Sequence, residues 1–133
     1  MEINIQYAHH DFDESESRAV NRAEEILSAF DGFDWSGQVE QANQLQKCSP
    51  TLSLIFERNK HMIWVSGFGA DSPIGFVSEC CFPGEVPKFL GFGSKPGTVS
   101  LYAQNFSFEQ ARRALEHFVK KEYEALRSLY GNK

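Results

Sequence analysis

The sequence has few cysteines, no long hydrophobic run and no leader-like start. It contains three cysteines, and Cys80 and Cys81 are adjacent, so the residues make a poor disulfide framework and we expect reduced thiols. No stretch approaches the roughly 18 consecutive apolar residues that a membrane-spanning helix needs. The first residues, Met1 to Gln6, lack the basic-then-apolar order of a secretory signal. These absences predict a cytoplasmic protein without a membrane segment.

Basic side chains are also scarce. The chain has 13 Lys and Arg residues against 18 Asp and Glu residues, which gives a formal net charge of -5. This balance weighs against direct binding of nucleic acid, because such binding depends on neutralising phosphates. The first 40 residues hold ten acidic side chains but only two basic ones, Arg18 and Arg22. An acidic surface near the N-terminus is therefore expected.

What the sequence does contain is typical of a folded domain. Of its 133 residues, 41% are hydrophobic and 14% are aromatic, with Phe the commonest aromatic residue. This composition supplies enough apolar side chains for one sizeable core, and the length leaves no room for a second. We therefore expect residues 1–133 to form a single domain.

The first third of the chain shows two kinds of periodicity. Ile3 and Ile5 alternate with polar residues, which predicts a half-buried strand. Apolar residues then recur at helical spacing, which predicts a helix that begins at Asp13 or Ser15. Its stripe consists of Ala19, Ala23, Ile26, Leu27 and Phe30, and Gly32 would end it. Residues 33–50 are polar, and we expect a long connection with a short helix near residues 40–45.

The second half predicts consecutive short strands and a closing helix. Turn-forming residues separate the strands, and Pro83-Gly84 is one such predicted turn. Short connections favour antiparallel pairing, because parallel crossovers need a dozen residues or more. Ser107 and Gln110 form a capping box that opens an amphipathic helix running to Leu129. The predicted strands are 51–57, 61–66, 74–81, 88–92 and 97–103.

These elements together predict an α+β fold. Its antiparallel sheet would have about five or six strands, packed against two main helices in the chain order β-α-β-β-β-β-α. The apolar stripes of both helices should pack against the sheet, including Ile26 and Phe30 from the first and Leu115 and Phe118 from the second.

Few residue patterns predict chemistry. His9, His10 and Asp11 supply metal-ligand side chains, yet adjacent residues on extended chain point to opposite sides, so a solvated loop is the favoured interpretation. Cys80-Cys81 lacks the C-x-x-C spacing of zinc sites and is better explained as buried small residues near a strand end. The glycine-rich segments do not match a phosphate-binding loop. We expect no catalytic, cofactor or metal site.

The acidic residues near aromatic ones predict a protein interface. Phe33 and Trp35 lie among carboxylates, so a ring could act as a buried anchor while the acids complement a basic partner. A second interpretation, compatible with the first, is that these two rings close the end of the core. The predicted partner-binding residues are Asp11, Asp13, Glu14, Asp31, Asp34 and Trp35.

The overall layout resembles a known class of proteins. Its features are the acidic first helix, the strand segments Ser49 to Leu54 and Met62 to Val65, and the closing helix from Phe106 to Phe118. These features resemble the small α+β immunity proteins of bacterial polymorphic-toxin and contact-dependent growth inhibition systems. The resemblance implies a non-enzymatic protein that neutralises a cognate toxin domain by covering its active site or substrate surface. Many such toxins act on nucleic acids, so a basic partner is expected.

An alternative function comes from a different class. A small enzyme, or a protein that binds a small ligand or a metal, could use a pocket between sheet and helices near His9, His10 and Asp11.

Overall fold

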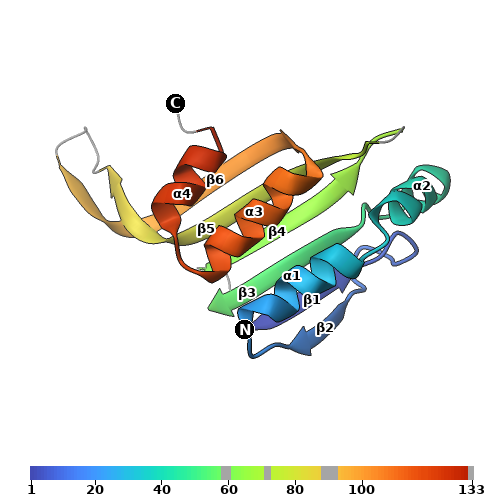
Figure 1. Cartoon of the computed structure of the whole chain (residues 1–133), viewed down its shortest axis with the longest axis horizontal. Helices are drawn as coiled ribbons and strands as arrows, with labels where there is room; N and C mark the ends of the chain where they lie inside the picture. The colour runs from blue at the N-terminus through green and yellow to red at the C-terminus, as the bar shows by residue number, and fades with distance from the viewer. Residues whose placement is uncertain (58–60, 71–72, 88–92, 132–133) are drawn as a thin grey trace.

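One antiparallel sheet forms the base of the fold (Figure 1). The computed structural model describes residues 1–57, 61–70, 73–87 and 93–131. Within these residues six strands pair in the spatial order β2-β1-β3-β4-β5-β6. The strands are β1 (Glu2–Gln6), β2 (Glu16–Ala19), β3 (Thr51–Glu57), β4 (His61–Phe68), β5 (Gly75–Pro87) and β6 (Ser94–Phe106). All neighbouring strands are antiparallel. The short connections from β3 to β6 predict this, whereas β1 and β3 pair although β2, α1 and α2 lie between them in the chain.

Four helices are present in the described part of the chain, and they form the second layer. Figure 1 shows α1, α3 and α4 on the same face of the sheet, while α2 lies at one end. Their bounds are α1 (Ala23–Gly32), α2 (Trp35–Leu45), α3 (Phe108–Val119) and α4 (Tyr123–Leu129). The α+β class and the antiparallel sheet are confirmed, with four helices where two main helices and one short helix were predicted. None of these helices is long and apolar enough to cross a membrane.

The core lies between the sheet and the helices. Ile26 and Phe30 from α1 and Leu115 and Phe118 from α3 are fully buried, so these members of the predicted stripes are confirmed. Ala19, which was also predicted in the first stripe, lies in β2 and is exposed. The sheet contributes the residues of each strand that point toward the helices, because side chains alternate between the two faces. The fully buried apolar ones on the central strands are Ile3, Leu52, Leu54, Ile63, Val65, Phe76 and Cys80.

The predicted start of the first helix, at Asp13 or Ser15, is wrong. A strand, β2, precedes the helix, and α1 begins only at Ala23. Nδ2 of Asn4 in β1 donates hydrogen bonds to Oγ of Ser15 (2.8 Å) and Oγ of Ser17 (2.9 Å). Helical spacing is a local signal, whereas β1 supplies partners from elsewhere in the chain, and this pairing prevails over the local pattern.

The predicted connection at residues 33–50 is shorter than expected, because α2 occupies most of it. The helix begins at Trp35 instead of near residue 40. Oδ1 of Asp34 accepts a hydrogen bond from the backbone N–H of Gly37 at 3.1 Å, so Asp34 caps the helix.

The predicted turn at Pro83-Gly84 is also wrong, because both residues lie inside β5. β5 pairs with β4 only as far as Cys81, which lies opposite Met62, and beyond that point it pairs with β6 alone. One edge of β5 is therefore free at Pro83, and proline is tolerated on such an edge. The β5–β6 hairpin consequently extends beyond the helical layer (Figure 1).

The closing helix begins as predicted but is interrupted. Oγ of Ser107 accepts from the N–H of Gln110 at 3.1 Å, and Oε1 of Gln110 accepts from the N–H of Ser107 at 2.9 Å, which confirms the capping box. Lys121 has a φ of 59°, in the left-handed region, and separates α3 from α4. The strand predicted at residues 88–92 lies outside the described residues.

Candidate functional site

The acidic loop, defined as residues 7–15, connects β1 to β2 and packs against the α1–α2 junction. The ring of Tyr7 stacks on that of Phe33, with 5.4 Å between centroids. The backbone N–H of Ala8 donates to Oε1 of Gln38 at 2.9 Å. These contacts join the first residues of the loop to the junction, and none of them involves a predicted carboxylate. The loop carries Asp11, Asp13 and Glu14, and the junction carries Asp31, Asp34 and Trp35.

Hydrogen bonds hold the outer half of the acidic loop. Nε2 of Gln6, at the end of β1, donates to three backbone oxygens of the loop. The acceptors are Asp11 (3.4 Å), Phe12 (3.2 Å) and Glu14 (3.2 Å). The N–H of Asp11 also donates to Oε1 of Glu14 at 2.8 Å. A loop that is ordered in this way loses less conformational freedom when a partner binds.

Phe12 projects from this ordered loop into solvent. It is 86% exposed, the highest fraction among the large exposed hydrophobic residues of the described chain. Asp11 and Asp13 flank it, and Asp11 is 3.4 Å from Nζ of Lys47 in an exposed ion pair. Aromatic rings among carboxylates are also the pattern that predicted an interface at Phe33 and Trp35. The same pattern at Asp11-Phe12-Asp13 could have identified Phe12, which was missed.

Asp31 and Asp34 both have partners within the chain. Nε of Arg112 lies 2.9 Å from Oδ1 of Asp31, and its Nη2 lies 3.0 Å from Oδ2, so the pair is bidentate. This hydrogen bonding raises the pKa of Arg112 above its ordinary value. Asp34 caps α2 through Gly37, as described above. Asp31 and Asp34 therefore already bind groups of the same chain, which leaves less of their negative charge for a partner.

Trp35 is a core residue, 4% exposed. Its Nε1 donates to the backbone oxygen of Phe30 at 3.0 Å, and its ring lies 5.3 Å from that of Phe30 and 5.0 Å from that of Phe76. Trp35 therefore closes the end of the core, as the second interpretation of the sequence predicts. A partner contact through the small exposed edge of the ring stays a prediction.

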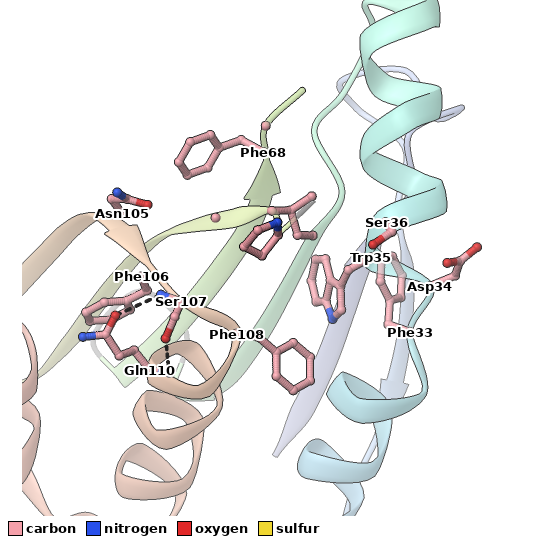
Figure 2. A pocket seen from close by; sticks show the side chains of 14 residues that line it. Phe33, Asp34, Trp35, Ser36, Phe68, Asn105, Phe106, Ser107, Phe108 and Gln110 are labelled. Atoms are coloured by element: carbon pink, nitrogen blue, oxygen red, sulfur yellow. Dashed lines mark hydrogen bonds between the residues drawn. The ribbon is translucent and has the colours of Figure 1, made fainter. Parts of the chain in front are cut away.

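A groove of about 700 Å³ lies beside Trp35, between the α1–α2 junction, the β4–β5 connection and the start of α3 (Figure 2). Phe33 and two partly exposed rings, Phe68 and Phe108, line it together with Trp35. A Cβ at Gly67 would lie 3.1 Å from Cε3 of Trp35, a tight contact, so a larger residue there would require the ring or the strand to shift slightly. Its lining mixes these rings with polar side chains such as Asn105 and Gln110, and its volume lies within the size range of small-ligand sites.

The histidines of the alternative site lie in the acidic loop and do not line this groove. Nδ1 of His10 accepts from the backbone N–H of Tyr7 at 2.9 Å, and this nitrogen is therefore engaged in holding the loop. The rings of His9 and His10 are 4.5 Å apart. Among the residues that the structure describes, no group of three His, Cys, Asp or Glu side chains could hold a metal ion. The alternative function stays a prediction.

The three cysteines are free thiols. Cys48 and Cys80 are buried, and Cys81 is half-buried on the opposite face of β5 from Cys80. Burial raises the pKa of Cys80 from 9.0 to about 12. Cys80 is therefore an uncharged thiol at neutral pH and a poor nucleophile.

No protein-family model, no curated protein and no solved structure matches the chain. Its function must be inferred from its own residues.

Proposed function

We propose that this protein is a non-enzymatic immunity protein, which binds a cognate bacterial toxin domain and neutralises it by covering its active site or substrate surface. The observation that carries the proposal is Phe12, which stands 86% exposed between two aspartates on a loop held by Gln6. The resemblance to immunity proteins of polymorphic-toxin and contact-dependent inhibition systems supplies the biological setting.

The chemistry of the acidic loop suits a basic partner. Aromatic residues commonly supply a large share of binding energy at interfaces when a pocket of the partner takes them up. Carboxylates around such an anchor attract a basic surface and accelerate the encounter, and this attraction weakens as salt rises. A toxin that acts on nucleic acid presents a basic cleft, which an acidic loop with a central ring can enter.

The proposal predicts a secreted-toxin gene immediately upstream of this chain's gene, and the test begins with the toxin domain that such a gene encodes. Co-expression with the wild-type protein should abolish its toxicity, and the purified proteins should form a one-to-one complex. Continued toxicity, or no complex, would contradict the proposal. A stoichiometric metal in the purified protein would instead favour the alternative at His9, His10 and Asp11.

A matched pair of variants then tests the loop. Asp11→Lys/Asp13→Lys should slow association with the toxin by about tenfold or more at low salt. Glu109→Lys/Glu124→Lys changes the total charge equally, but at exposed positions on α3 and α4. This control should change the rate much less. Equal effects of both double variants would mean that overall charge, and not the acidic loop, governs binding.

A further inference from the structure

The sheet has a face that no described helix covers. Leu54, Ile63 and Cys80 point toward the helical layer and are fully buried. Their chain neighbours Ile55, Met62 and Cys81 must point the other way, because side chains alternate along a strand. Figure 1 shows α1, α3 and α4 on the first of these faces only. We call the second one the open face.

The centre of the open face is apolar. Met62 in β4 lies directly opposite Ile55 in β3 and Cys81 in β5, so the three side chains are neighbours. Trp64 lies two residues further along β4 on the same face. These residues are only half-buried and do not pack against the core cluster. The apolar patch consists of Ile55, Met62, Trp64, Val77, Cys81 and Tyr102.

This patch differs from an ordinary solvated sheet. An antiparallel sheet with one free face usually carries polar side chains there. Here the face carries a tryptophan, whose cross-strand neighbours are Ser53 and Glu79. Tyr102 lies opposite Glu79 on the edge strand β6 and is 52% exposed. Large apolar and aromatic side chains with a few polar ones among them are typical of a protein interface.

The charges on the open face favour one kind of partner. Every charged side chain that the structure describes on this face is a glutamate: Glu2, Glu79 and Glu85. A second copy of the chain would bring glutamates against glutamates, which disfavours self-association. A basic protein surface would complement them.

The open face is continuous with the acidic loop. Asn4 and Gln6 alternate with the buried Ile3 and therefore point to the open face. The side chain of Asn4 binds Ser15 and Ser17 on the strand and loop that follow Phe12, and that of Gln6 binds the backbone oxygen of Phe12 itself. The loop that presents Phe12 thus forms one rim of the open face.

We infer that the open face is the main docking surface for the basic toxin domain, with Trp64 as its central anchor and the acidic loop at its rim. This inference rests on the proposed function and specifies where the toxin binds. It moves the anchoring tryptophan from Trp35, which is buried in the core, to Trp64.

Variants on opposite faces of the molecule test the inference. Trp64→Ala should weaken binding of the upstream-encoded toxin domain by about 30-fold, the loss typical of a central aromatic anchor. Glu79→Lys should slow association severalfold at low salt, while the matched control Glu109→Lys on α3 should leave it nearly unchanged. Circular dichroism would confirm that each variant is folded.

Alkylation of the unmodified protein provides a second measurement, which needs no variant. Cys81 belongs to the open face, whereas Cys48 and Cys80 are buried and serve as internal controls. Bound toxin should slow the alkylation of Cys81 by iodoacetamide at least tenfold. If the wild-type protein neutralises the toxin but Cys81 reacts equally fast and Trp64→Ala binds normally, the inference is overturned and the proposed function stands. If the wild-type protein does not bind the toxin, both are overturned.

Discussion

Phe12 and Trp35 should respond in opposite ways to truncation, although both are aromatic residues next to aspartate. Trp35→Ala removes a ring that packs against Phe30 and Phe76. Phe12→Ala removes a ring that is 86% exposed. We expect the first change to reduce the stability of the fold and the second to reduce only the affinity for a partner.

The size of each effect follows from burial. Truncating a buried tryptophan removes on the order of 150 Å² of apolar contact, and at about 25 cal/mol per Å² this costs about 4 kcal/mol. This value agrees with the roughly 3 to 5 kcal/mol typical of such substitutions. The backbone oxygen of Phe30 loses the hydrogen bond from Trp35 but keeps one from the N–H of Phe33 at 3.4 Å. Because this oxygen is not left without a donor, the substitution adds no large further loss of stability. Phe12→Ala should stay within about 0.5 kcal/mol of wild type.

Urea unfolding followed by circular dichroism would measure both free energies of unfolding. Trp35→Phe is the control, because it keeps a ring in the core and should recover part of the loss. A loss below about 1 kcal/mol for Trp35→Ala would refute the assignment of this residue to the core. A loss above about 2 kcal/mol for Phe12→Ala would show that the acidic loop packs more tightly than its exposure indicates.

Three further predictions concern stability and reactivity. Phe118→Ala should lower the free energy of unfolding by about 3 to 5 kcal/mol, because the residue is fully buried. Calorimetry should show a large drop in melting temperature, and a near-wild-type curve would contradict the packing of α3. Ser107→Ala should cost about 1 kcal/mol in urea unfolding, whereas Ser107→Asp, which can still cap, should cost little. Burial holds the pKa of Cys80 near 12 against 9.0 in the unfolded chain, so the unfolded chain loses this proton first and stability should fall as pH rises between these values. At pH 8, peptide mapping should find Cys81 alkylated well before Cys80, and equal rates would contradict the burial.

The elements that the sequence predicts correctly are those with strong local signals. Strand β3 was placed at 51–57, where alternating apolar residues follow Pro50, and the structure has these bounds. The capping box at Ser107 is likewise local, because both of its hydrogen bonds join residues three positions apart. Such signals do not depend on distant parts of the chain.

The wrong predictions arise where distant contacts decide the structure. β2 forms because β1 offers a partner strand, and no local pattern in residues 16–19 indicates this. Pro83 and Gly84 read locally as a turn, yet β6 pairs with β5 through both residues, with Thr98 opposite Pro83 and Gly97 opposite Gly84. In both cases the local preference is misleading, because the pairing of β2 with β1 and of β5 with β6 depends on other parts of the chain.

The sequence indicates the candidate site only in part, because exposure depends on the whole fold. Composition shows acidic character near the N-terminus. It does not show that Trp35 is buried while Phe12 is exposed and Trp64 is half-buried. A further pattern in the sequence indicates the open face. The segment Met62 to Val65 is apolar at four consecutive positions, and such a run places apolar side chains on both faces of its strand. In a sheet with helices on only one face, half of that run must meet solvent or a partner. The combination of a two-faced apolar strand and a single helical layer therefore argues that the open face is covered when the protein acts.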